Sequence, residues 1–184
     1  ESDSLVAALF TTYRDLGGDV AAWAAPWVEG RPPFVLSSLF PVAGDLPLLP
    51  MPRLPVKFAQ PDFLTLKKLK KLRYVSPAIL RLLLAGREMD SHWQRDARQP
   101  PGPLWSLGGG AVWLSEDERP LLPAAWRRQS PTALTAQSVW DVSAVARVTV
   151  DRSTAAGNIY LTGRTVYTPD CGLWCLAQVD ARGG

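Results

Sequence analysis

The feature that most constrains this chain is a two-residue alternation of apolar and polar side chains over 146–164, interrupted by a short polar turn. Val148 and Val150 alternate with polar neighbours, and Ile159 and Leu161 resume the same period after the turn. This period places apolar groups on one face of a strand and polar groups on the other, so each half is predicted to be a half-buried strand. The intervening small residues include a glycine that can adopt positive φ. The sequence therefore predicts a β-hairpin with a polar tip.

The polar side of this hairpin carries candidate phosphate contacts. Arg147 and Arg152 flank Asp151, and guanidinium groups bind phosphates in a planar, bidentate geometry. The alternative is an ordinary surface hairpin whose Arg–Asp pair is only solvated. The pattern alone leaves both interpretations open.

Length and charge permit a polyanionic partner without requiring one. The 184 residues suffice for one domain or slightly more, and a hydrophobic content of 47% excludes wholesale disorder. The formal net charge is +3 and the pI is near 9.1, which is a mild basic bias. No basic segment precedes an apolar run, and no apolar stretch reaches the roughly eighteen residues of a membrane span. We therefore predict a cytoplasmic protein with no membrane partner.

Signals for catalysis and metal binding are weak. Cys171 and Cys175 are too few for a disulfide framework, and no neighbouring ligand completes a metal site. The single histidine, His92, has no nearby His or Cys with which to form a nucleophile–base pair. The scattered acids Asp3, Asp45, Asp141 and Asp151 show no spacing typical of a catalytic carboxylate pair. The sequence predicts no catalytic residue, no metal and no cofactor.

Two helices are predicted near the beginning of the chain. Ser2 or Asp3 as the cap and an apolar stripe at three- and four-residue spacing predict the first, which ends before a glycine pair. The second, over 19–28, carries Trp23 and Trp27 on one face. Their helical spacing favours packing over base stacking.

Two further segments carry candidate ligand-binding side chains. Ser37 and Ser38 interrupt a strand-like run over 34–41, where polar groups either face solvent or bind a ligand's oxygens. Farther along, cations alternate with leucines, so the leucines anchor one side while the cations reach outward. These cations are Lys67, Lys68, Lys70, Lys71 and Arg73. The competing interpretation is a solvated face.

The middle of the chain combines one clear helix with an irregular segment. Ser76 as N-cap and Pro77 at the first helical position predict the helix. Mixed charge, prolines and glycines predict a long irregular insertion or mobile loop over about 87–137, in which short elements can form around Leu104 to Leu114. We interpret Gly108–Gly110 as flexible, because the Lys-Ser/Thr of a phosphate loop does not follow it. A later run, 172–179, is predicted to be a third strand.

Five segments taken together carry a family resemblance. They are Asp3-Ser-Leu-Val-Ala-Ala-Leu9, Pro33-Phe-Val-Leu-Ser-Ser-Leu-Phe-Pro41, Leu49-Pro-Met-Pro52, Lys68-Leu-Lys-Lys-Leu-Arg-Tyr-Val-Ser76 and Arg147-Val-Thr-Val-Asp-Arg152. In this order they resemble the RAMP-superfamily subunit that holds the 5′ end of the guide RNA in the Csm, or type III-A, CRISPR interference complex. The match extends across nearly the whole chain.

The resemblance implies an α+β fold of the ferredoxin-like (RRM) type, with an antiparallel sheet, helices on one face and a projecting hairpin. It implies an N-terminal RAMP domain over 1–184 that contains the irregular insertion. Family members usually begin with a strand before the first helix and carry a second ferredoxin-like half, and neither is present in this sequence. We therefore expect a fragment that lacks both and exposes a sheet edge.

The resemblance also implies a non-catalytic subunit that binds crRNA in antiviral defence. In this family a thumb-like hairpin wedges into the guide RNA. The subunit caps the repeat-derived 5′ handle beside the large palm-domain subunit and the backbone RAMP subunits. The expected hairpin contacts are Arg147, Thr149, Asp151, Arg152, Ser153 and Thr154. Such contacts hold RNA through phosphates and splayed bases, while guide pairing supplies the target specificity.

Two other functions stay open. A RAMP endoribonuclease would cut guide precursor or target RNA, with Asp151 or Asp3 assisting the attack of a 2′-hydroxyl or of water. A scaffold that contacts only protein would leave the lysines as a solvated face. Salt dependence distinguishes the scaffold, because RNA affinity falls steeply with salt when several phosphates are neutralised.

Overall fold

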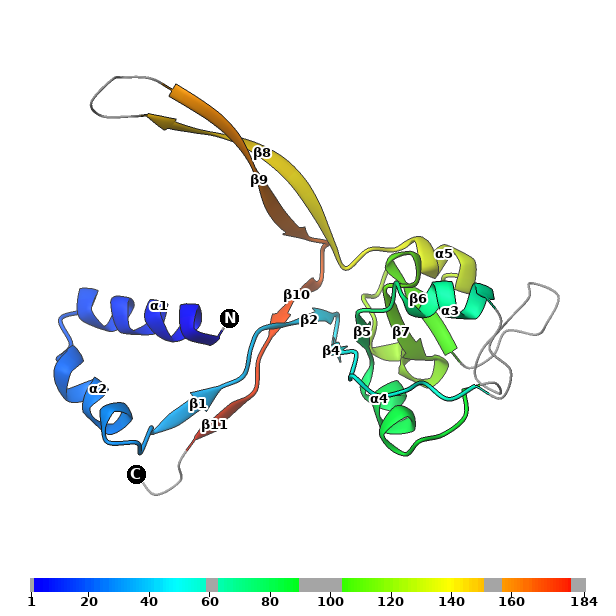
Figure 1. Ribbon diagram of the computed structural model, residues 1–184, viewed down its shortest axis with the longest axis horizontal. Coiled ribbons are helices and arrows are strands. Elements are labelled where there is room, and N and C mark those ends of the chain that lie inside the picture. Colours follow the sequence, from blue (N-terminus) through cyan, green and yellow to red (C-terminus); the bar gives the residue numbers. More distant parts are fainter. Residues whose placement is uncertain (1, 59–62, 90–103, 151–156, 180–184) are drawn as a thin grey trace. The chain divides into compact units, whose positions relative to one another are not determined.

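The computed structural model describes residues 2–58, 63–89, 104–150 and 157–179. It shows a mixed α+β chain that divides into two compact units (Figure 1). The first unit comprises Glu1–Phe40 and Leu173–Gly184, and the second comprises Pro41–Gly172. The single RAMP domain expected from the sequence stays a prediction.

The first unit consists of two helices and a small sheet. Helices α1 (Ser2–Asp15) and α2 (Val20–Val28) are followed by strand β1 (Phe34–Leu36), which pairs antiparallel with β11 (Ala177–Val179) from near the other end of the chain. Figure 1 shows this pairing of a blue strand with a red one. Both helices lie where the sequence predicted them, because their caps and stops are local signals.

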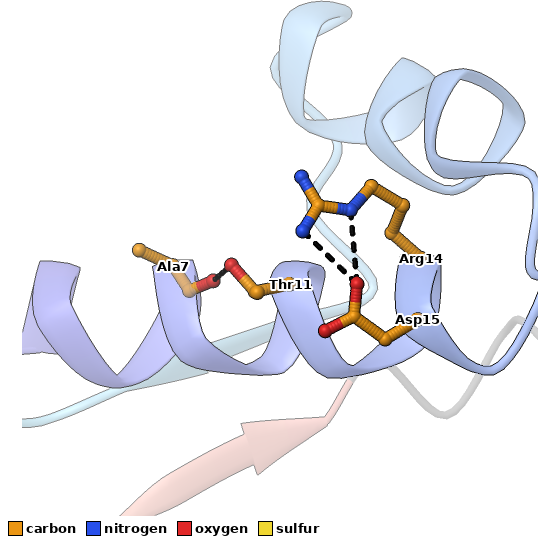
Figure 2. A network of polar contacts seen from close by, with 4 residues as sticks. All are labelled: Ala7, Thr11, Arg14 and Asp15. Carbon is orange, nitrogen blue, oxygen red and sulfur yellow. Dashed lines mark hydrogen bonds and ion pairs between the residues drawn. The ribbon is translucent and has the colours of Figure 1, made fainter.

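The polar contacts of α1 that Figure 2 shows join residues close together in the sequence. The Thr11 hydroxyl donates to the backbone carbonyl of Ala7, one turn earlier. The Arg14 guanidinium donates two hydrogen bonds to one carboxylate oxygen of Asp15, at 2.9 and 3.1 Å. All four residues are exposed, so these contacts add little to stability.

Half-buried aromatic side chains pack against one another in the first unit. The ring of Phe10 on α1 lies 4.5 Å from that of Trp23 and 5.4 Å from that of Trp27, measured between centroids. Trp27 also contacts Phe34 of β1 edge-on at 5.0 Å. The tryptophans of α2 therefore pack against other rings, as their helical spacing predicted.

The second unit contains short strands and helices before the long hairpin described below. They are β2 (Phe40–Ala43), β3 (Leu46–Pro47), β4 (Leu49–Pro50), α3 (Phe63–Leu69), β5 (Tyr74–Val75), α4 (Pro77–Leu84), β6 (Leu104–Leu107), η1 (Gly108–Gly110), β7 (Val112–Ser115), η2 (Glu116–Leu121) and α5 (Pro131–Ala136). Helix α4 begins as predicted: Ser76 is its N-cap and accepts a hydrogen bond from the backbone N–H of Ile79.

The sheets differ from a single antiparallel sheet. One has the strand order β10-β2-β3, where β10 is Cys171–Trp174, and another has the order β4-β5-β7-β6. Pairs β2–β3, β4–β5 and β6–β7 are antiparallel as expected, but β5 and β7 are parallel. A parallel pair requires a crossover of a dozen residues or more, and α4 lies in the connection between these two strands.

From Leu104 onward, the segment expected to be an irregular insertion contributes a large part of the core. This corrects the prediction for residues 104–137, while residues 90–103 lie outside the described part. Its buried side chains are Trp105, Leu107, Val112, Trp113, Leu114, Leu122, Trp126 and Leu134. They belong to two clusters, one on each face of the β6–β7 pair. The strands are only four residues long, too short for the alternation to stand out against the neighbouring glycines and prolines.

The triple glycine has a defined conformation instead of the flexibility predicted for it. Gly108, Gly109 and Gly110 have φ values of 58°, 64° and 96°, a region that residues with a Cβ rarely adopt. The N–H of Gly108 donates to the carbonyl of Gln137 at 2.7 Å. The glycines therefore serve a tight connection between β6 and β7.

Candidate nucleic-acid interface

The most extended feature of the second unit is a two-stranded ribbon. Strands β8 (Trp140–Val150) and β9 (Gly157–Tyr167) pair antiparallel along their whole length (Figure 1). The hairpin predicted from the alternation is therefore confirmed. Its strands are longer than expected, because cross-strand hydrogen bonding continues to Trp140 and Tyr167.

One face of the ribbon is apolar but not buried. The register places Val148 opposite Ile159 and Ala146 opposite Leu161, so their side chains share a face. Ile159 is 74% exposed and Leu161 71% exposed. The prediction of half-buried strands is thus wrong for this chain, because no other described part of the second unit covers that face. Exposed apolar surface of this kind marks interaction sites.

The opposite face combines cations with an aromatic ring. Arg147 lies directly opposite Tyr160, and Ser143 lies opposite Arg164. Both arginines are exposed, and Tyr160 is 49% exposed. Thr149 projects from the same face. A guanidinium beside an accessible ring matches the two means by which proteins hold single-stranded nucleic acid, phosphate pairing and base stacking.

Tyr160 and Arg164 were not among the predicted site residues. The signal that places them was present in the sequence: each follows the two-residue period that puts it on the polar face. Among the described residues of the ribbon, Asp141 is the only acidic side chain, and it lies at the base. Beyond Asp141, the charged side chains of the described polar face are therefore the guanidiniums of Arg147 and Arg164.

Part of the predicted site cannot be placed. Asp151, Arg152, Ser153 and Thr154 lie outside the described residues, so their roles stay predictions. The described strands end at Val150 and resume at Gly157.

The base of the ribbon is anchored in the core of the second unit. Val139, just before β8, is buried, and its carbonyl accepts a hydrogen bond from the N–H of Thr168 at 3.1 Å. Trp140 meets the ring of Tyr74 edge-on, with centroids 5.5 Å apart. Burial, with a smaller contribution from nearby Tyr74, raises the pKa of Tyr167. These contacts fix the base of the ribbon to the core of the second unit.

The predicted lysine segment forms a second basic surface in the same unit. All five of its cations, Lys67, Lys68, Lys70, Lys71 and Arg73, are exposed. Leu72 is buried and Leu69 packs against the same core cluster. Leu69 and Leu72 therefore anchor one side and the cations reach outward, as predicted, whereas Leu66 is 47% exposed.

The predicted serines belong to the first unit. The Ser37 hydroxyl donates to the Ser38 carbonyl at 2.8 Å and accepts from the N–H of Leu176 at 2.9 Å. Ser37 also donates its own N–H to the Leu176 carbonyl. These bonds hold Leu176 between β10 and β11, which explains why the third strand predicted over 172–179 is two strands. Ser37 therefore has a structural role, while Ser38 is exposed.

Two other kinds of feature are absent from the described ranges. There, no group of three His, Cys, Asp or Glu side chains is arranged to hold a metal ion. Among the helices of the same ranges, none combines the length and apolarity needed to cross a membrane. His92 lies outside the described residues.

Comparison with known proteins gave matches at the level of structure. No protein-family model matches the chain, and no curated protein matches it. A chain from the crystal structure of the Csm3-Csm4 subcomplex of the type III-A CRISPR-Cas interference complex matches with a TM-score of 0.61 and 18% identity. The alignment covers 96% of this chain and 51% of that one. The chain shares its fold with about half of that chain of a type III-A CRISPR complex.

A second Csm structure matches over the same extent. A chain from the Csm1-Csm4 cassette in complex with cA4 gives a TM-score of 0.51 and 19% identity, covering 97% of this chain and 53% of that one. Csm4 is the component common to both assemblies. The resemblance stated from the sequence is thus confirmed in the fold. The present chain spans about half the length of the Csm-complex chains that it matches.

Proposed function

We propose that this chain is part of a Csm4-like, non-catalytic subunit of a type III-A CRISPR complex, which binds the 5′ handle of the guide RNA in cytoplasmic antiviral defence. The likeness to chains of Csm assemblies supports the complex. A ferredoxin-like, RRM-type core is part of the same proposal.

The observation that carries the RNA assignment is the polar face of the β8–β9 ribbon. Arg147 and Arg164 supply exposed guanidiniums there, and Tyr160 supplies an exposed ring opposite Arg147. Guanidiniums bind phosphates and rings stack on unpaired bases without requiring a particular sequence. These properties suit a guide strand whose bases are held mainly by shape.

The two-faced ribbon also suits assembly with other subunits. Its apolar face is exposed along both strands, including Val142, Val148, Ile159 and Leu161. An isolated two-stranded ribbon is marginally stable in water, so covering this face would stabilise it. We propose that the subunit lies beside the large palm-domain subunit and the backbone RAMP subunits.

The test measures binding of the chain to labelled 5′-handle RNA and to scrambled RNA at two salt concentrations. We expect the double variant Arg147→Ala/Arg164→Ala to weaken binding and to make it less dependent on salt, by about one unit of slope for each phosphate that is no longer neutralised. The control, Arg14→Ala/Arg31→Ala, removes two exposed arginines of the first unit that pair with acids. Equal RNA affinity of the two double variants would overturn the assignment.

The same binding reactions distinguish a non-catalytic RNA-binding subunit from an endoribonuclease. Gel analysis of the bound RNA should show no cleavage products if the subunit is non-catalytic. Cleavage that disappears in the Asp151→Asn variant would replace this proposal with a nuclease.

A further inference from the structure

A cavity of about 400 Å³ lies next to the lysine segment, within the second unit. Its volume is within the range of small-molecule sites. Its walls come from α3 and the turn after it, the β6–β7 pair with its glycine connection, and α5. Apart from the two lysines, none of its lining residues was among the predicted site residues.

The floor of the cavity is a rigid part of the sheet. Ser106 lies directly opposite Trp113, and Leu104 projects from the same face two residues earlier on β6. Trp113 is 1% exposed and belongs to the core cluster beneath. The floor is therefore formed before any ligand arrives and is mostly apolar, with one hydroxyl.

The hydrogen bonds of two hydroxyl groups that line the cavity show which oxygen can accept from a ligand. The Thr135 hydroxyl donates to the carbonyl of Pro131 at 2.9 Å, and the Ser106 hydroxyl lies 2.9 Å from the Thr135 oxygen. Because a hydroxyl has a single proton, Ser106 must donate to Thr135. The remaining lone pairs of Ser106 can then accept from the N–H groups of a base or from a sugar hydroxyl.

The rim of the cavity is positively charged. Lys68 and Lys71 line it, both are exposed, and a turn with a 3.0 Å hydrogen bond from the N–H of Lys71 to the carbonyl of Lys68 connects them. Among the described residues that line the cavity, none is acidic. Two ammonium groups on one short turn attract a phosphate.

Glycines keep one side of the cavity open. A Cβ added to Gly109 or Gly110 would meet no atom within 4 Å, and both have positive φ. Glycine at these positions thus satisfies the turn and leaves its space unfilled.

We propose that this cavity binds one nucleotide, with its phosphate against Lys68 and Lys71 and its base or sugar over the floor formed by Leu104, Ser106 and Trp113. The inference rests on the proposed function to the extent that the nucleotide belongs to the guide strand. A nucleotide is preferred to a bare phosphate because the cationic rim continues into a largely apolar space with hydrogen-bond acceptors.

The test blocks the cavity without changing its charge. Thr132 is exposed and lines the cavity, whereas Ala133 is exposed on the same helix and does not line it. Thr132→Trp and its control Ala133→Trp are compared with the parent in binding labelled 5′-handle RNA and, separately, adenosine monophosphate. Thermal unfolding of both variants checks that the fold is retained.

We expect Thr132→Trp to weaken RNA binding by about tenfold, the scale of removing one base from its binding site, with an unchanged salt slope. Ala133→Trp should bind like the parent. Lys71→Gln should lower both the affinity and the slope. Equal binding by Thr132→Trp and Ala133→Trp overturns the cavity site and leaves the ribbon's RNA assignment intact.

Binding of adenosine monophosphate distinguishes a free nucleotide from a nucleotide of the guide strand as the ligand of the cavity. If the parent binds no RNA, the proposed function fails. Binding of adenosine monophosphate that Thr132→Trp abolishes would then still support the cavity, as a site for a free nucleotide. Absence of both RNA and nucleotide binding overturns the inference as well.

Discussion

One carboxylate oxygen of Glu118 accepts a hydrogen bond from the backbone N–H of Ala78 at 2.8 Å, across 40 residues of sequence. The other oxygen accepts from the N–H of Ser115 at 3.0 Å, within the capping box of η2. Glu118 is 8% exposed. A single buried side chain therefore satisfies otherwise unpaired amides at the beginning of both α4 and η2.

Replacing this carboxylate should lower stability. Glu118→Ala leaves two amides without their acceptor, and removing a buried partner costs about 1–3 kcal/mol each time. We expect a decrease of at least that size in the free energy of unfolding, measured by urea denaturation. Glu116→Ala, at an exposed neighbour, is the control and should change it by less than about 0.5 kcal/mol. Similar values for the two variants would contradict the capping role.

The turn between β2 and β3 should not tolerate a side chain. Gly44 has a φ of 61°, and an added Cβ would lie 2.5 Å from the carbonyl oxygen of Leu121 and 2.7 Å from two further backbone atoms. We expect Gly44→Ala to lower the free energy of unfolding by more than about 1 kcal/mol. In Gly157→Ala the nearest neighbour of the new Cβ would be a side-chain methyl of Val148 at 3.6 Å, so this variant should unfold like the parent. A neutral Gly44→Ala would disprove the close approach.

Truncating a leucine should lower stability strongly in the core and hardly at all on the exposed face of the ribbon. Leu107 is 0% exposed in the core, while Leu161 lies on the exposed apolar face of the ribbon. Leu107→Ala should cost about 2–5 kcal/mol through reduced burial and a residual cavity. Leu161→Ala should stay within about 0.5 kcal/mol. We expect the exposed apolar face to promote self-association of the parent, and this variant should show less of it in light scattering. Strong destabilisation by Leu161→Ala would mean that this face is covered in the isolated chain.

The thiol of Cys171 should react slowly near neutral pH. Burial raises its pKa above the ordinary value of 9.0; Asp170 adds to the shift, and a hydrogen bond from the Gly44 backbone opposes it. Alkylation of the native protein, followed by mass spectrometry, should therefore require a higher pH at Cys171 than in the urea-unfolded chain. Equal pH profiles in the two states would refute the shift.

The raised pKa of Cys171 also determines the direction in which stability changes with pH. A raised pKa means that the folded state holds the proton more tightly than the unfolded state. The associated stabilisation is complete below the unfolded-state pKa and is lost as the pH rises through the folded-state pKa. The thermal stability of the parent should thus decline faster above about pH 9 than that of Cys171→Ser.

Features governed by neighbours in sequence were predictable. The cap at Ser76, the helix containing Trp23 and Trp27, and the ribbon strands all depend on residues within one turn or one alternation. The outward direction of Lys68 and Lys71 followed in the same way from the leucines between the cations. Even Tyr160 could have been placed on the polar face by counting in twos.

Other features depended on segments far apart in the sequence. Short strands such as β6 and β7 carry too few residues for a clear period, so the core around Leu107 and Trp113 was taken for an irregular insertion. The exposure of Ile159 also escaped prediction, since alternation shows that a face is apolar but not whether anything covers it.

The sequence by itself determined the local elements: the caps, the amphipathic helices, the two-faced ribbon and the basic segment. These follow from hydrogen bonds and side-chain periods that close within a few residues. Only the tertiary structure decided that Glu118 caps a helix 40 residues away, that β5 and β7 run parallel, and that Lys71 and Thr132 line one cavity. Contacts of this kind depend on which apolar surfaces are buried together when distant segments pack, and no local sequence pattern specifies this.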